Sequence, residues 1–359
     1  MLESSEQRSL RCVDNTLESS RLTSKALLVG LGAVAVAVTL GLTIGPVPLR
    51  FDRVILELLD GIPGLTIDSG LSEAHQAIVN KLRLPRVVLG LLAGATLSLS
   101  GAAYQGAFRN PLADPYLLGV AAGAGLGATI AITQDWGDGA GFIDLVPLAA
   151  FAGALLAVGI SYLAGHLGGN STVSLVLAGV AVASFLTAVQ TYVQQSNTDA
   201  LREVWAWILG RVATSGWAEP ALITPYFVLM VVLILRYRRA LDALSVGDEE
   251  ATSLGLNPRR IRAIVVLAAS LGAAAAVAVT GLIGFVGIIV PHTVRLIFGA
   301  SHRALLPLSL LFGGAFMVLA DLAARTLLAP AELPIGVVTA FIGAPVFALI
   351  LRTSRREIW

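Results

Sequence analysis

Histidine, cysteine and serine are the side chains that most often carry catalysis or bind metals, and here they form no recognisable set. The four histidines lie far apart in the chain, and the single cysteine is Cys12. Ser301 and His302 are adjacent, which is reminiscent of a hydrolase, but they fall in an expected loop with no partner base nearby. The chain has neither a metal-ligand spacing nor a Gly-Lys-Ser/Thr phosphate loop. We therefore expect the polar residues to bind and dock rather than to catalyse.

An acidic segment between two apolar runs has the pattern of a short helix. Asp248, Glu249 and Glu250 fit its first turn, where negative charge complements the helix dipole. Gly255 fits its C-terminal cap, and Pro258 its stop. A short helix outside the membrane, flanked by arginines, is suited to docking on a partner protein. An ordinary solvated connector is the equal alternative.

Charged residues also stand at the ends of apolar runs. Arg83 and Arg86 lie at the start of one run, and Asp321 and Arg325 lie four residues apart near the end of another. Arginines at a membrane boundary usually anchor a helix by snorkelling. Ionisable residues inside a crossing are candidates for function. For Asp321 and Arg325, a self-neutralising pair is the alternative.

One apolar run contains a polar stripe. Ser184, Thr187, Thr191 and Gln194 recur every three or four residues, with Gln190 beside them, so they share one helix face. Membrane helices turn polar groups away from lipid. The stripe predicts either the lining of a pathway or hydrogen bonding between helices, and the pattern does not decide between the two.

The composition predicts how these residues are held. Of 359 residues, 56% are hydrophobic and 13% are charged, and the mean hydropathy is +0.82. A soluble domain carries about 25% charged residues, so we expect an all-α polytopic membrane protein. The net charge of +1 argues against a nucleic-acid-binding protein.

Ten apolar runs are long enough to predict ten crossings. One stretch of 37 residues is too long for a single crossing, and we divide it at Gly281, Gly284 and Gly287. Residues 46–85 are expected to form an extramembrane loop with short helices. The runs are 26–45, 87–108, 115–133, 145–167, 173–194, 220–236, the two parts of 262–298, 304–328 and 335–351.

The arginines and lysines predict the orientation. With ten crossings, about two thirds of the 24 basic residues fall on the side that holds both termini. Because basic residues are enriched in cytoplasmic loops, we expect both termini in the cytoplasm.

Glycines recur at spacings of four, at Gly90 and Gly94 and again at Gly119, Gly123 and Gly127. Small residues in this pattern allow two helix backbones to approach closely. Packing within one subunit is the simpler interpretation, and an interface between subunits is the alternative.

Several strings occur together, in an order and spacing that resemble a known family. The set resembles the FecCD-type permease family of ABC importers for iron–siderophores, haem and cobalamin, over residues 26–352. The strings are Arg83-Leu-Pro-Arg86, Arg109-Asn-Pro-Leu-Ala-Asp-Pro115, Gly284-Phe-Val-Gly287, Pro291-His292, Glu332-Leu-Pro-Ile-Gly336 and Gly343-Ala-Pro-Val-Phe347.

The resemblance implies a ten-helix ABC type II importer permease fold and a multi-pass location in the cytoplasmic (inner) membrane. It implies a second permease subunit, two cytoplasmic ABC ATPase subunits and an extracytoplasmic substrate-binding protein. ATP and Mg belong to the ATPase in such a system, so no cofactor is expected on this chain, and neither is enzyme activity.

The resemblance also assigns roles to residues. Coupling helices are expected at about residues 240–258, and arginines that meet the binding protein at the outer ends of two crossings. The stripe is expected to line the pathway. The matching positions are Asp248, Glu249, Glu250, Ala251, Leu254 and Gly255 for ATPase coupling; Arg83, Arg86 and Arg325 for docking; Ser184, Thr187, Thr191 and Gln194 for the pathway; and Asn170, Ser171 and Thr172 for an inner gate.

The expected organisation is therefore a mobile cytoplasmic tail (1–25), one permease domain (26–352) and a short cytoplasmic C-terminal tail (353–359). The expected cargo is an iron(III)–siderophore, with haem and cobalamin open. A secondary transporter with ten crossings and no ATPase is the alternative; it would need carboxylates at mid-membrane, and no run has one at its centre. A structural or assembly subunit is a third interpretation, which the polar stripe disfavours.

Overall fold

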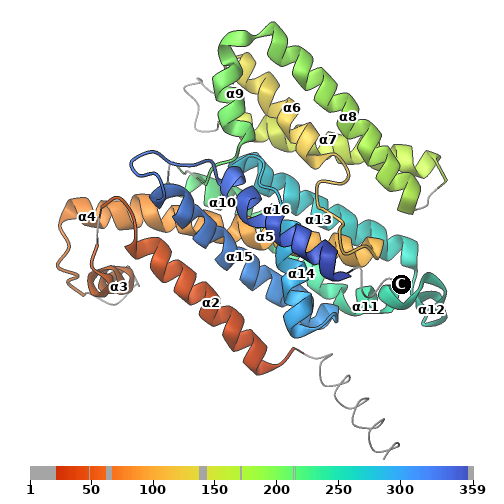
Figure 1. The fold of residues 1–359 in the computed structure, drawn as a ribbon, viewed down its shortest axis with the longest axis horizontal. Coiled ribbons are helices and arrows are strands. Elements are labelled where there is room, and N and C mark those ends of the chain that lie inside the picture. Colours follow the sequence, from red (N-terminus) through yellow and green to blue (C-terminus); the bar gives the residue numbers. More distant parts are fainter. Residues whose placement is uncertain are drawn as a thin grey trace, which may run out of the picture.

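In the computed structural model, every regular element of the described residues is helical (Figure 1). The described residues are 22–47, 49–61, 67–136, 144–169, 172–212, 214 and 216–354, and side chains are described as far as 349. The expected N-terminal tail lies outside this range except for its last four residues, and the last five residues of the C-terminal tail also lie outside it.

Ten apolar helices occupy the ten positions that the sequence predicts. Within the described residues, seven are long and apolar enough to cross a membrane, and three are shorter. The long helices are α2 (Ser24–Thr43), α5 (Leu84–Phe108), α7 (Leu145–Leu167), α8 (Thr172–Ser196), α10 (Ala218–Arg236), α13 (Pro258–Thr280) and α15 (His302–Thr326). The shorter ones are α6 (Val120–Thr133), α14 (Val286–Phe298) and α16 (Ile335–Ser354, apolar to Leu349).

Short helices connect these elements. The loop predicted after the first crossing contains α3 (Phe51–Asp60) and α4 (Glu73–Ala77), which continues through a π-helical turn (Ile78–Arg83) into α5. A helix that the sequence did not predict, α9 (Leu201–Ile208), follows α8 and the 3₁₀ turn Thr198–Ala200. Between α10 and α13 lie α11 (Arg238–Val246) and α12 (Asp248–Ser253).

The long apolar stretch breaks where the glycines predict, between α13 and α14. Gly281 ends α13 with a φ of 70°, a value that favours glycine. A side chain at Gly281 would also collide with the carbonyl of Trp207. Two chain segments can therefore cross here only because Gly281 lacks a Cβ. Gly287, the last of the three glycines, lies inside α14 and not in the break.

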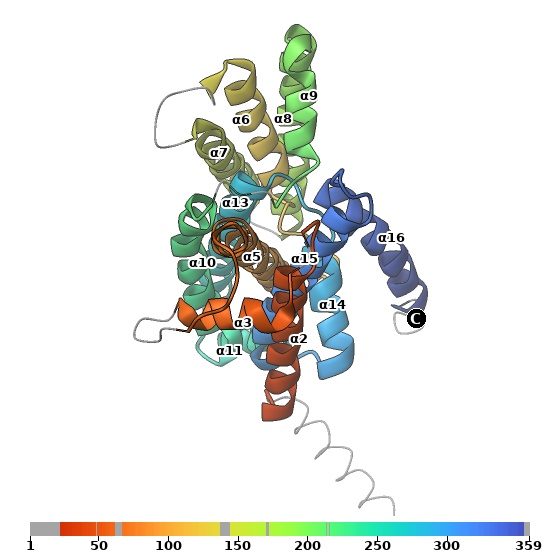
Figure 2. The same cartoon turned by 90° about the vertical axis from the view of Figure 1, so that its left-hand side faces the viewer.

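Helix α5 is the centre of the bundle. It is buried over most of its length and packs against α13, α14 and α15 (Figures 1 and 2). A side chain at Gly94 would collide with the carbonyl of Gly313 in α15, and one at Gly101 with that of Gly287 in α14. The small residues therefore let the backbones approach closely within one subunit.

Helices α6, α7 and α8 form a second group, which Figure 1 shows beside the central bundle. Gly123 and Gly127 lie against the backbones of Gly153 and Ala149 in α7. This confirms packing within one subunit for these two glycines. The group contacts the central bundle mainly through α7 and α13. Helix α8 is hardly covered, because only 6% of its apolar window is buried.

The two ends of the bundle differ in the elements they carry. Helices α11 and α12 lie with the C-terminal end of α16 at one end, and α3 and α4 lie at the opposite end (Figure 1). We call these the α12 end and the α4 end.

Candidate functional site

Helix α12 forms as the acidic segment predicts. Its first turn holds Asp248, Glu249 and Glu250, and Gly255 follows it with a φ of 76°. Pro258, predicted as a stop, is instead the first residue of α13, whose N-terminus is capped by the side chain of Asn257. Proline is well suited to this position because the first helical N–H needs no partner within the helix.

Asp248 ties α12 to the bundle. Its carboxylate lies 3.2 Å from Arg109, just after α5, and 3.0 Å from Arg262 in α13. The Arg262 Nε also donates to the Ala107 carbonyl at 2.8 Å. Ala251, on the inward face of α12, is fully buried. These two residues therefore hold α12 in place, although the Asp248 side chain remains 44% accessible beside its arginines.

The rest of α12 faces outward. Glu249, Glu250, Leu254 and Gly255 are all exposed, and Leu254 is 69% accessible. On α11, Val246 is 72% accessible. Exposed apolar side chains rimmed by polar ones are typical of an interaction surface. The α12 end therefore presents a small acidic and apolar surface on a firmly anchored helix. The coupling roles of its six residues stay predictions.

A residue that sequence reasoning missed anchors α11. Asp242 accepts hydrogen bonds from the backbone N–H of His302 at 2.6 Å and from the Ser301 hydroxyl at 3.3 Å. Its Oδ1 also lies 3.0 Å from His302 Nδ1, and its Oδ2 lies 3.7 Å from Arg303 Nε. Burial would raise the pKa of Asp242, but the hydrogen bonds from the His302 side chain and backbone outweigh it and lower the pKa. Nothing in the local sequence pairs residues 60 positions apart.

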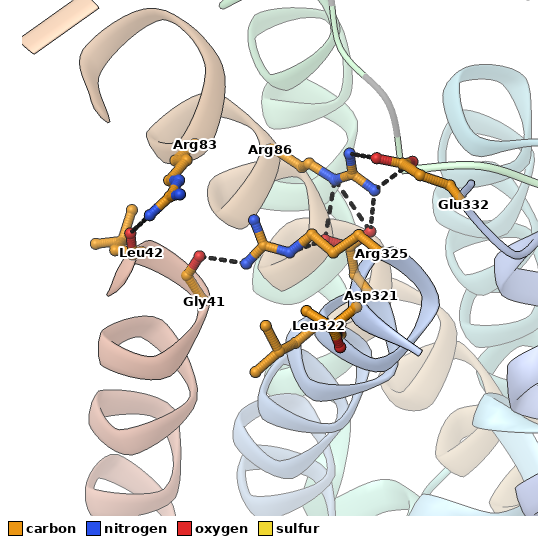
Figure 3. Close-up of polar contacts among 9 residues, drawn as sticks. Gly41, Leu42, Arg83, Arg86, Asp321, Leu322, Arg325 and Glu332 are labelled. Atoms are coloured by element: carbon orange, nitrogen blue, oxygen red, sulfur yellow. Dashed lines mark hydrogen bonds and ion pairs between the residues drawn. The ribbon is translucent and has the colours of Figure 1, made fainter. Parts of the chain in front are cut away.

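At the α4 end, Arg86 is the hub of an arginine cluster that comprises Arg83, Arg86, Asp321, Arg325 and Glu332 (Figure 3). Its guanidinium donates to both oxygens of Asp321 at 2.8–3.1 Å and to both oxygens of Glu332 at 2.9 Å. The hydrogen bond from Arg86 also lowers the pKa of Glu332 against a smaller opposing effect of burial. The pair predicted between Asp321 and Arg325 is present, but at 3.8 Å it is the longer contact.

The other two arginines of the cluster cap helix α2. Arg83 donates to the carbonyls of Leu42 and Thr43 at 2.7 and 3.0 Å, and Arg325 donates to the carbonyl of Gly41 (Figure 3). The last carbonyls of a helix lack partners within it, and cationic side chains can satisfy them. Arg83 and Arg325 are only 5% and 4% accessible. Their docking role stays a prediction, and their described contacts are internal.

The polar stripe of α8 divides into two parts. Gln190 donates to the Thr129 hydroxyl of α6 at 3.1 Å, which is the hydrogen-bonding alternative. Thr187, Thr191 and Gln194 line a cavity of about 740 Å³, together with Gln190 itself, Tyr116, Trp205 and other residues. Ser184 is not among the lining residues, and its hydroxyl bonds to the Val180 carbonyl of its own helix.

The predicted inner gate is only partly described. Asn170 and Ser171 lie outside the described residues. Thr172 is the first residue of α8 and lines a cavity of about 350 Å³ beside Arg259, Arg260 and Arg262.

Comparison with known proteins agrees with this arrangement. Residues 33–353 match the model of the FecCD transport family. The chain is 39% identical to the ABC transporter permease protein YvrB of Bacillus subtilis, over 92% of this chain and 94% of that protein. It is 43% identical to the cobalamin import system permease protein BtuC of Halobacterium salinarum, over 81% and 79% of the two chains. It is 37% identical to the hemin transport system permease protein HmuU of Yersinia pestis, over 81% and 87%.

A solved structure is similar over the same extent. An inward-facing metal-chelate type ABC transporter superimposes with a TM-score of 0.79 and 30% sequence identity, and covers 92% of this chain and all of that one. The family match extends beyond the central bundle to α6–α9 and α16.

Proposed function

This chain belongs to the FecCD transport family and is the permease subunit of an ABC importer, and we propose that its cargo is an iron(III)–siderophore delivered by a substrate-binding protein. The observation that carries a transport pathway is the polar face of α8, which lines a cavity while its helix remains almost uncovered. A polar face of this kind is unfavourable against lipid.

We propose that a second permease subunit covers α8, as a copy of this chain or a related one. The pathway would then run between the two subunits, lined by Thr187, Thr191 and Gln194. The cavity beside these residues has no carboxylate or histidine among its lining residues. Hydroxyl and amide groups bind an iron chelate weakly, so the cargo would pass without losing its metal to the protein.

At the α12 end, we propose that two ATPase subunits seat against the exposed residues of α12, one on each permease. ATP hydrolysis and Mg binding belong to the ATPases in this scheme, and this chain binds no cofactor of its own. ATP can shift the transporter between two states only by binding them with different affinity. Because Asp248 joins α12 to α5 and α13, motion of a docked ATPase would tilt these helices with it.

We propose that the binding protein docks at the α4 end, on the outer side, with both termini of this chain in the cytoplasm. Arg86 is the most exposed of the three arginines in the cluster, with 17% of its side chain accessible, and it bonds to the half-exposed Glu332. An acidic surface on the binding protein would compete with Glu332 for this guanidinium.

The secondary-transporter alternative fits the structure less well. Asp321, the carboxylate buried within α15, is held at 2.8 Å by Arg86. It serves there as the counter-ion of a permanently charged guanidinium at the end of a crossing, and not as a carboxylate at mid-membrane.

The test is uptake into proteoliposomes that contain this permease, its cognate ATPase and the candidate binding protein. Ferric siderophore, haemin and cobalamin are compared, with and without ATP inside the vesicles. We expect ATP-dependent uptake of the siderophore complex and little of the other two. Preferential uptake of haemin or cobalamin would refute the proposed iron(III)–siderophore cargo. Uptake in vesicles without the ATPase would refute ATP-driven transport.

A further inference from the structure

The N-terminus of α15 is capped by a residue from another helix. Ser301 occupies the N-cap position, but its side chain makes no capping hydrogen bond, and the first turn of α15 contains no acidic residue. The first N–H groups of a helix need partners. Asp242 of α11 supplies a carboxylate at this place, where it bonds the N–H of His302 at 2.6 Å.

The same carboxylate makes three further contacts with the N-cap residue and the first two residues of α15. They are the Ser301 hydroxyl, the His302 imidazole and the Arg303 guanidinium. One side chain of α11 therefore touches three consecutive residues of the loop and the helix start. A charged, multiply bonded contact of this kind holds geometry better than one neutral hydrogen bond.

The imidazole extends the connection to the central helix. His302 is buried, and a side chain at Gly106 of α5 would collide with its ring. The ring thus lies between Asp242 on one side and the end of α5 on the other. Any displacement of α11 would press on α5 and pull on α15.

We propose that Asp242 is a positioning residue that makes α11 and the start of α15 move as one body during transport. This proposal rests on the coupling role given to α11 and α12 above. The chain itself connects these two helices only to α10 and α13, whereas Asp242 adds α15, which packs along α2 and α5. Asp242 and Asp248 therefore attach α11 and α12 to the bundle at two separate points, each through a carboxylate.

The first test measures a distance in the assembled importer. Cys12 is replaced by serine, and spin labels are placed at Arg239 on α11 and at Ala300, directly before the start of α15; both residues are exposed. We expect the distance between the labels to stay the same with and without ATP. In Asp242→Ala, we expect the distance to change on ATP binding. A distance that already changes in the parent protein would overturn the proposal.

The second test measures cargo moved per ATP hydrolysed. Coupling free energies are commonly worth 5–150-fold, so we expect this ratio to fall about fivefold or more in Asp242→Ala. Asp242→Asn keeps one acceptor oxygen and loses the charge, so an intermediate value is expected; Asp242→Glu should restore most of the ratio. Asp52→Ala, which removes an exposed ion pair at the α4 end, is the matched control.

A purely structural role predicts a different result. Transport and ATPase activity would then fall together with the amount of folded complex, and their ratio would not change, which would overturn the proposal. Failure of the coupling role itself is recognised separately, because Glu250→Arg would then leave the ATPase bound and coupled. If Glu250→Arg uncouples the importer but Asp242→Ala does not, only the α15 connection is refuted.

Discussion

The α12 end and the α4 end use the same chemistry in opposite ways. At the α12 end, carboxylates on short helices reach inward to arginines and to a helix start, and the remaining acidic side chains stay exposed. At the α4 end, arginines reach inward to helix carbonyls and carboxylates, and only Glu332 of the cluster is substantially exposed. The α12 end therefore presents exposed acidic side chains to a partner, whereas the charges at the α4 end are neutralised within the protein.

The difference indicates how each end would meet a partner. The exposed acidic and apolar side chains of the α12 end can bind a partner without first breaking an ion pair or hydrogen bond within this protein. Arg86 can bind an acidic partner only by giving up a bond to Glu332 or Asp321, so docking there is an exchange of ion pairs. Such an exchange gains little net energy, and it is therefore well suited to a partner that must leave after each delivery.

Glu250→Arg should have the largest effect on function, because it reverses charge in the centre of the exposed surface of α12. We expect loss of the ATPase from the purified complex, or loss of coupled transport if the complex survives. Co-purification and binding-protein-stimulated ATPase activity measure this. Glu73→Arg, the same reversal on exposed α4 at the opposite end, is the control for co-purification of the ATPase. An intact Glu250→Arg complex with normal stimulation would mean that α12 is only a connector.

Asp321→Asn should have the largest effect on stability. It leaves Arg86 and Arg325 near each other without their shared buried counter-ion, and breaking such a pair typically costs about 3–5 kcal/mol. Thermal unfolding in detergent measures the loss.

Combined charge reversal of Arg83 and Arg86 should abolish transport, in part because α2 loses the donors to its last carbonyls. Transport at the parent level in that double variant would refute the docking role.

The sequence predicted the elements well because its signals were local. Apolar runs located the ten helices, Gly281 located the break, and the acidic triplet with Gly255 located α12. The prediction for the arginine cluster was less complete, since it expected outward-facing charge. Arg83 is buried because the end of α2, about 40 positions earlier, needs donors, and such a distant requirement leaves no local pattern.

Distant pairs account for the rest of what the sequence did not reveal. Arg86 and Glu332 are 246 positions apart, and Asp242 and His302 are 60 apart. Each of these residues has an ordinary sequence explanation, as a membrane anchor, a solvated charge or a loop residue. Only packing brings them together. The stripe on α8 was found because its period is local, but which of its members face the cavity depends on α6 and α9.

Thr191→Leu should have an intermediate effect on function that is confined to the pathway. A bulky apolar side chain would narrow the cavity without touching either end of the molecule. We expect cargo uptake to fall by up to about tenfold, equivalent to ~1.4 kcal/mol in a barrier, while the complex still assembles with its ATPase. Ser184→Ala, on the same helix but outside the cavity lining, is the control. Equal uptake by Thr191→Leu and the parent protein would remove α8 from the pathway.

Glu332→Gln should have the smallest effect on stability and is the most specific test of ion-pair exchange at the α4 end. Glu332 is half-exposed, so loss of its pair with Arg86 should cost no more than about 1 kcal/mol. The pKa of Glu332 is lower in the folded protein than its ordinary value of 4.5. Its contribution to stability is therefore complete above that value and is lost as the pH falls through the lower, folded pKa.

The difference in melting temperature between Glu332→Gln and the parent should accordingly stay constant from pH 8 to about pH 5.5, a unit above the ordinary glutamate pKa, and shrink only in more acidic solution. At neutral pH the variant should bind the binding protein more tightly, because Arg86 no longer has to give up a charged partner. Asp52→Asn, which removes the charge of an exposed pair elsewhere at this end, should leave that affinity unchanged. Weaker binding by Glu332→Gln would mean that the partner contacts Glu332 itself, and the exchange of ion pairs would have to be abandoned.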